Sequence, residues 1–78
     1  MGTFTRYMDD SLLLLALGKK IRSIRRNKDM TQNQLSINCN FEKSTMSKIE
    51  AGKVNLSYIT LYRISKGLGV DIKDLLPI

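Results

Sequence analysis

The chain has 78 residues and is expected to form one small domain, in which dimerisation supplies part of the stability. One cysteine and no histidine exclude an intrachain disulfide and leave no ligand spacing for a zinc site. The formal net charge of +6 favours an anionic partner.

The positive charge is concentrated in the middle of the sequence. Between Lys19 and Lys53 there are nine basic residues and three acidic ones, whereas the rest of the chain carries four of each sign. A one-sided basic segment is typical of proteins that bind nucleic acid. Charge alone leaves a second interpretation equally open, in which these side chains only solvate a helical face.

The first predicted element is an amphipathic helix from about Asp10 to Lys28. Its apolar residues recur at spacings of three and four, and they are Leu13, Leu14, Leu17, Ile21 and Ile24. Gly18 lies inside this helix at a cost of up to about 1 kcal/mol relative to alanine, unless a neighbouring helix approaches closely there. Residues 1–9 are expected to be a loosely ordered extension of a single domain that spans residues 1–78.

The apolar run at the start of this helix, residues 12–17, is too short for a membrane span, which needs roughly 20 residues. Asp9 and Asp10 precede the run, where a signal peptide would carry positive charge. A cytoplasmic protein without a membrane partner is therefore expected.

Two short helices joined by a turn are predicted next. Thr31 and Gln34 match a capping box, in which the Thr31 side chain accepts from the Gln34 backbone and the Gln34 side chain bonds back to Thr31. The helix that follows runs from about Gln32 to Cys39, and Asn40 supplies the left-handed residue that a sharp turn requires. The third helix is expected from about Lys43 to Ala51, where a glycine ends it.

Two more helices complete the prediction of an all-α, five-helix fold. Ser57 is a suitable cap for a helix from Tyr58 to Leu68, which Gly69 ends. Asp71 can cap a short fifth helix that stops at Pro77. No segment predicts a strand.

The second and third helices match a helix-turn-helix, whose second helix enters the major groove of DNA. Lysine can donate to guanine O6 and N7, and serine can bond to bases or to phosphate. The exposed face of the third helix carries four candidate DNA base-reading residues, Lys43, Ser44, Ser47 and Lys48. On residue types alone, an ordinary solvated helix face is at least as well supported as a face that reads DNA bases.

An ordered set of motifs extends from this segment over much of the chain. It consists of Thr31-Gln32-x-x-Leu35-Ser36, Asn40-Phe41, Met46-Ser47-x-Ile49-Glu50-x-Gly52, Ser57 and Lys66-Gly67-Leu68-Gly69-Val70. The set resembles the XRE family, which includes the lambdoid phage repressors and Cro proteins, over roughly residues 17 to 76. The resemblance implies a lambda-repressor-like DNA-binding domain with its helix-turn-helix at helices 2 and 3.

The resemblance also implies roles for single residues beyond the base-reading positions. Phosphate binding is implied for Gln32 at the start of the second helix and for Lys53 and Asn55 in the loop after the third. Arg25 and Glu50 match a structural ion pair of the family, so Arg25 is not counted among the DNA contacts. The contribution of the first helix then falls to Arg22, Arg26 or Lys28, of which Arg22 is chosen.

Two positions depart from the family pattern. Asn40 stands where glycine is usual, which is conformationally benign, because asparagine tolerates the left-handed region. Glu42 caps the third helix where serine, threonine or aspartate is commoner, and its carboxylate near the DNA backbone opposes tight binding. Cys39 stands where the family has a small buried apolar residue, so a core role is preferred for it over a redox sensor.

Within the family, the Asn55-Leu56-Ser57 and Lys66-Gly67-Leu68 segments most resemble the controller proteins of restriction-modification systems. That resemblance implies a homodimeric transcriptional regulator that binds double-stranded DNA at a palindromic operator without a cofactor, with RNA polymerase as a further candidate partner. A phage-type repressor is the second interpretation. Dimer contacts are expected through the fourth and fifth helices, and Leu12 and Leu15 offer a rival interface.

A competing hypothesis from another class is a protein-interaction module, such as an antitoxin or a polymerase adaptor. Its affinity would be insensitive to salt and lost on mutation of apolar surface residues. An enzyme is not expected, because the sequence has no histidine, no nucleophile beside a base, no glycine-rich phosphate loop and no metal-ligand spacing.

Overall fold

The computed structural model describes residues 9–77, which contain four α-helices, one short 3-10 helix and no strand. The elements are α2 (Asp10–Asn27), α3 (Gln32–Cys39), α4 (Lys43–Glu50), α5 (Tyr58–Leu68) and η1 (Ile72–Leu75). The all-α prediction is confirmed, and these four α-helices start and stop within one residue of their predicted bounds. The extension expected before the first helix lies, except for Asp9, outside the described residues.

The prediction of a fifth α-helix is wrong. Residues Ile72–Leu75 form a single 3-10 turn, and Leu76 already has an extended backbone with φ −75° and ψ 131°. Leu76 precedes Pro77, and the residue before a proline is sterically driven out of the helical region. Four residues between Asp71 and this boundary allow a 3-10 turn but no longer α-helix.

Local capping signals explain the bounds of the helices. The Thr31 hydroxyl accepts from the Gln34 N–H at 3.0 Å and the Gln34 side chain accepts from the Thr31 N–H at 2.7 Å, which confirms the capping box. After α3, Asn40 adopts the left-handed conformation with φ 60°, and the Phe41 N–H donates to the Ser36 carbonyl at 2.8 Å. This Schellman-type ending makes the turn into α4 short and well defined.

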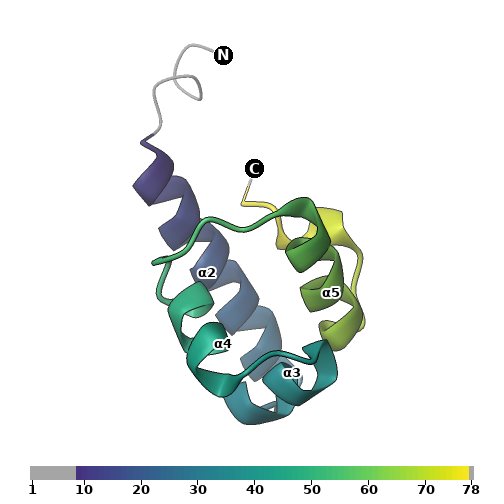
Figure 1. The fold of residues 1–78 in the computed structure, drawn as a ribbon. Coiled ribbons are helices and arrows are strands. Elements are labelled where there is room, and N and C mark those ends of the chain that lie inside the picture. Colours follow the sequence, from purple (N-terminus) through teal and green to yellow (C-terminus); the bar gives the residue numbers. More distant parts are fainter. Residues whose placement is uncertain (1–8, 78) are drawn as a thin grey trace.

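The helices pack around one apolar core. In Figure 1, α3 lies between α4 and α5, and the long helix α2 runs along α4. All four α-helices and η1 contribute core side chains, namely Leu17, Ile21, Leu35, Cys39, Met46, Ile49, Ile64, Leu68 and Leu75. Within residues 9–77 no helix is long and apolar enough to cross a membrane.

Two glycines inside helices mark places where backbones meet. A Cβ on Gly18 would lie 2.5 Å from the Glu50 carbonyl oxygen and 2.7 Å from that of Ile49. A Cβ on Gly67 would lie 2.5 Å from the sulfur of Cys39. Gly18 therefore allows α2 to touch the end of α4, as the sequence suggested, and Gly67 allows α5 to touch α3.

Cys39 is a core residue, as preferred from the sequence. Its side chain is buried and its thiol donates to the Arg63 carbonyl at 3.5 Å. Burial raises the pKa of the Cys39 thiol to about 11. The thiol is therefore protonated near neutral pH, and a protonated, buried thiol is a poor nucleophile.

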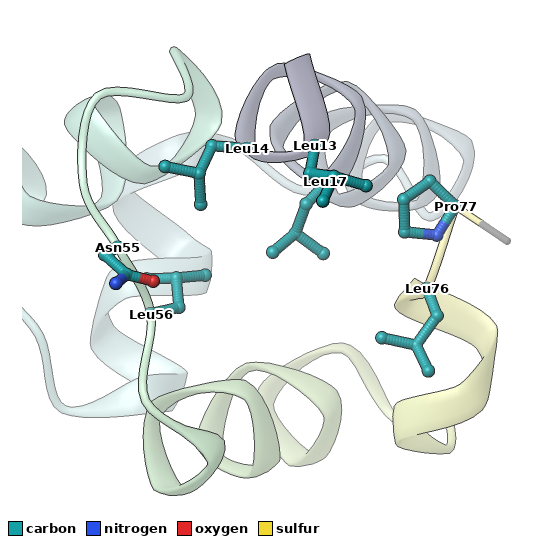
Figure 2. A pocket seen from close by; sticks show the side chains of 7 residues that line it. All are labelled: Leu13, Leu14, Leu17, Asn55, Leu56, Leu76 and Pro77. Atoms are coloured by element: carbon teal, nitrogen blue, oxygen red, sulfur yellow. The ribbon is translucent and has the colours of Figure 1, made fainter. Parts of the chain in front are cut away.

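An apolar hollow of about 230 Å³ lies on one side of the core. Figure 2 shows leucine side chains of α2 facing Leu56 of the α4–α5 loop and Leu76 near the C-terminus across it. The leucines of α2 that line the hollow are Leu13, Leu14 and Leu17, and Asn55 and Pro77 complete the lining. The hollow thus accounts for Leu13, Leu14 and Leu17 of α2, whereas Leu12 and Leu15 are exposed.

The contact at Gly18 gives the first prediction. Gly18→Ala should destabilise the chain by about 1 to 3 kcal/mol, because the added methyl group meets backbone carbonyls that cannot rotate away. This loss outweighs the gain of up to about 1 kcal/mol in helix propensity. Urea unfolding checks it, with Ser23→Ala on the exposed face of α2 as control. A Gly18→Ala chain more stable than the parent would contradict the close packing.

Candidate nucleic-acid interface

The exposed face of α4 is set by its three buried residues. Met46, Ile49 and Glu50 turn inward, so the opposite side of the helix faces solvent. All four candidate base-reading residues are exposed, namely Lys43, Ser44, Ser47 and Lys48, and Ser44 and Lys48 lie opposite the buried residues. Ser44 and Lys48 are four residues apart and hence neighbours on one face. This face carries donors of the kind that bind base edges and phosphates.

The first turn of α3 has donors suited to an anion. Thr31 satisfies the Gln34 N–H, whereas the N–H groups of Gln32 and Asn33 in that first turn have no partner within the helix. The positive end of the helix dipole lies at the same place. These donors suit a phosphate oxygen, and Gln32 in the same turn contacts Glu50 at the end of α4.

A buried ion pair holds α4 on α2. The Arg25 Nε donates to Glu50 Oε2 at 2.7 Å and its Nη2 donates to Glu50 Oε1 at 3.0 Å. The side chains are 9% and 2% exposed, respectively. Arg25 Nη1 also donates to the Met30 carbonyl at 2.7 Å, in the loop before α3. The pair expected from the sequence is thus present, and it also fixes the connection from α2 to α3.

Gln32 belongs to the same hydrogen-bond network. Its Nε2 donates to Glu50 Oε1 at 3.0 Å, and the side chain is only partly exposed. A carboxamide nitrogen carries two N–H groups, so one is still available to a phosphate oxygen. Glu50 thereby fixes the orientation of a side chain that the sequence assigned to phosphate binding.

The other expected phosphate contacts lie in different surroundings. Arg22 is exposed on α2, one turn from Gly18 and Arg25, which both contact the end of α4. It shares a polar groove with Lys19, Ser23, Arg26 and Asn27. Arg22 therefore lies on α2 next to the residues that contact the end of α4.

The loop after α4 contains the last two expected contacts. Lys53 is exposed directly after the left-handed Gly52. Asn55 is exposed too, and besides the apolar hollow it lines a second hollow together with Asp10, Leu13 and Leu14. Both Lys53 and Asn55 are therefore accessible, and a carboxylate that lines the same hollow as Asn55 makes its surroundings less favourable for a phosphate than those of Lys53.

Sequence reasoning assigned no base contact to two exposed residues at the start of α4. Thr45 is exposed beside Ser44, and its methyl group could contact a thymine methyl. Glu42 is the N-cap residue, yet its side chain makes no capping hydrogen bond.

A helix-turn-helix domain model matches residues 18–77 of the chain. The chain is 43% identical to control protein C.BamHI of Bacillus amyloliquefaciens over 63 residues. The aligned region covers 80% of this chain and 78% of C.BamHI. The chain belongs to this helix-turn-helix family. It is 32% identical over 62 residues to control protein C.MunI of Mycoplasma sp, which covers 78% of this chain and 84% of C.MunI.

A solved structure supports the same family. The restriction-modification controller protein C.Esp1396I is 37% identical in sequence, and its structure superposes on this one with a TM-score of 0.73. The superposition covers 76% of this chain and 77% of the C.Esp1396I chain. The resemblance to XRE-type regulators, and to restriction-modification controller proteins among them, is confirmed. The family is one of DNA-binding regulators rather than enzymes.

The buried pair gives the second prediction. Arg25→Ala should cost about 3 to 5 kcal/mol, because it leaves the Glu50 carboxylate buried without its partner. The double variant Arg25→Met with Glu50→Met should lose less than either single truncation, since it buries no isolated charge. Thermal unfolding monitored by circular dichroism measures both. If the loss in the double variant equalled the sum of the losses for Arg25→Met and Glu50→Met alone, the two side chains would not form a coupled pair.

Proposed function

We propose that the chain is a sequence-specific transcriptional regulator that binds double-stranded DNA as a homodimer on a palindromic operator. We propose further that it is the controller protein of a restriction-modification system. The observation that carries the proposal is the exposed face of α4, with Lys43, Ser44, Ser47 and Lys48 on a helix fixed by a buried ion pair. The relatives named control proteins support the choice among regulators.

In this proposal α4 enters the major groove and its exposed face reads the bases. Lys43 and Lys48 donate to guanine O6 and N7, and the two serines bond to bases or to nearby phosphates. The start of α3 binds the flanking backbone through Gln32 and the free N–H groups of its first turn. Lys53 binds phosphate after α4, and Arg22 does so from α2.

Two further parts of the proposal concern the chain as a whole. One domain carries the function, because a single core joins every described helix. A regulator bound beside a promoter can contact RNA polymerase, which we retain as a candidate partner. Asn55 is retained only as a phosphate contact implied by the family.

The dimer is proposed to form through the outer face of α5. Tyr58, Ile59 and Tyr62 are between 47% and 69% exposed and lie on adjacent turns. Lys66 lies over the Tyr62 ring at 5.7 Å from its centroid and borders this apolar face. The two recognition helices of such a dimer would need to lie about 34 Å apart to enter successive major grooves. Exposed Leu12 and Leu15 on α2 form the rival surface.

The apolar hollow favours one alternative function. A partner protein could insert an apolar side chain between α2 and Leu76, as expected of an interaction module (Figure 2). Such binding would not weaken steeply with salt, whereas release of counterions from DNA makes DNA binding strongly salt-dependent. Salt dependence therefore separates the two functions.

Selection of bound duplexes from a random DNA pool at two salt concentrations tests the proposal and gives the third prediction. The chain should enrich a palindrome whose affinity falls steeply with salt. Lys48→Ala should cost about 1 to 3 kcal/mol on that palindrome and relax the preference at one position of each half-site.

Lys53→Ala is the matched control for this selection, since Lys53 is an exposed lysine too and its loss removes a phosphate contact from every sequence. It should weaken specific and random DNA alike and leave the selected sequence unchanged. An equal loss on both kinds of DNA for Lys48→Ala would remove that residue from the base-reading set. Failure to enrich any sequence would contradict the proposed function.

The fourth prediction concerns the dimer. Tyr62→Glu should convert the dimer to monomer in sedimentation velocity experiments, because a charge on the apolar face of α5 would be buried in the interface. Leu12→Glu is the control and should leave the dimer intact. The reverse pattern would assign the interface to α2.

A further inference from the structure

The side chain of Glu42 has no evident structural role. It is the N-cap of α4, but the carboxylate makes no capping hydrogen bond and is exposed. Within residues 9–77 the carboxylate takes part in no ion pair, since the pair found there joins Arg25 and Glu50. A capping serine or aspartate would stabilise the helix, so the usual preference for capping residues is not followed here. Broken local rules concentrate at functional sites.

Backbone hydrogen bonds on both sides of Glu42 define its position. Asn40 is held in the left-handed conformation, the Phe41 N–H donates to the Ser36 carbonyl at 2.8 Å, and the Met46 N–H donates to the Glu42 carbonyl at 3.2 Å. The side chain of Glu42 therefore projects from a fixed point at the tip of α4. Residues at this end of a recognition helix are the ones that contact base edges.

A carboxylate in the major groove can only accept hydrogen bonds. The donors there are the N4 amino group of cytosine and the N6 amino group of adenine. The adenine amino group lies between two acceptors, its own N7 and the O4 of the paired thymine, which both repel a carboxylate. The cytosine amino group has an acceptor on one side only, the O6 of the paired guanine. Cytosine is therefore the base that an ionised Glu42 fits.

We propose that Glu42 is a specificity-determining residue that accepts a hydrogen bond from the N4 amino group of one cytosine in each half-site. The proposal rests on the DNA-binding function proposed above and adds a base reader to it. Repulsion between this carboxylate and the phosphates lowers affinity for DNA that lacks the cytosine. Glu42 thus contributes discrimination at the expense of general affinity.

Selection from a random pool with three proteins tests this inference. The parent chain should select a cytosine at one symmetric position of the palindrome. Glu42→Ala should lose the preference at that position only, and Glu42→Gln should shift it towards adenine, whose N6 and N7 a carboxamide can bind together. Asp10→Asn, which removes an equally exposed negative charge on α2, should leave the whole selected sequence unchanged.

Binding measurements then isolate the bond itself. Replacing the selected cytosine by 2-pyrimidinone, which lacks the amino group, should weaken the parent by about 5- to 150-fold and Glu42→Ala hardly at all. Glu42→Ala should bind random DNA more tightly than the parent does. Glu42→Ser, which supplies a capping side chain, should be at least as stable as the parent, so that its loss of the cytosine preference does not reflect unfolding.

The possible outcomes separate the two proposals. An unchanged selected sequence for Glu42→Ala and Glu42→Gln would overturn the role of Glu42 and leave the regulator intact. An equal change of affinity for all DNA would also overturn it, since that is the result of a charge effect alone. If the parent enriches no sequence, the DNA-binding function itself is wrong.

Discussion

The carboxylate of Glu50 joins three helices at one buried point. Arg25 of α2 donates to both of its oxygens, through Nε and Nη2. Gln32 at the start of α3 donates to Oε1, which also accepts from Arg25 Nη2. Gly18 allows the α4 backbone to sit directly on α2 beside this pair. The end of α4 is thus fixed both by backbone contact and by directed hydrogen bonds. A recognition helix held in this way presents its exposed side chains without further ordering, which lowers the entropic cost of binding.

The same pair also shapes the charge of the surface. Arg25 and Glu50 neutralise each other in the interior, so the exposed face near α4 is dominated by Lys43, Lys48 and Lys53. The excess of positive charge that the sequence places between residues 19 and 53 is thereby directed outward. Glu42 is the exception on this face, and its single negative charge is the feature from which we infer selectivity for cytosine.

The sequence predicted what is determined by short-range interactions. The capping box at Thr31, the left-handed Asn40 and the glycine after α4 are recognised from a few neighbouring residues, and the structure contains all three. The last segment was mispredicted, because a cap at Asp71 does not reveal that Pro77 leaves room only for a 3-10 turn. The bond between Gln32 and Glu50 joins residues 18 apart in sequence, so no local pattern could indicate it.

The roles of the site residues were harder to predict than the helices that carry them. Exposure of Ser44 and Lys48 follows from the spacing of the buried residues in α4, but the surroundings of Asn55 depend on how its loop passes α2. The family pattern assigns Asn55 to phosphate, whereas its neighbours are leucines and Asp10. Thr45 was overlooked because residue type gave no reason to prefer it to a solvated threonine.

The central claim is that the exposed face of α4 and the first turn of α3 form one DNA-binding surface. Titration of the isotope-labelled chain with its selected duplex, followed by amide chemical shifts, tests this claim most directly. The account predicts that the largest shifts map to residues 42–48, to residues 32–34 and to Lys53, with small shifts around the hollow that Leu56 and Leu76 line. Shifts centred on that hollow, with α4 unaffected, would contradict the account and identify a different binding surface.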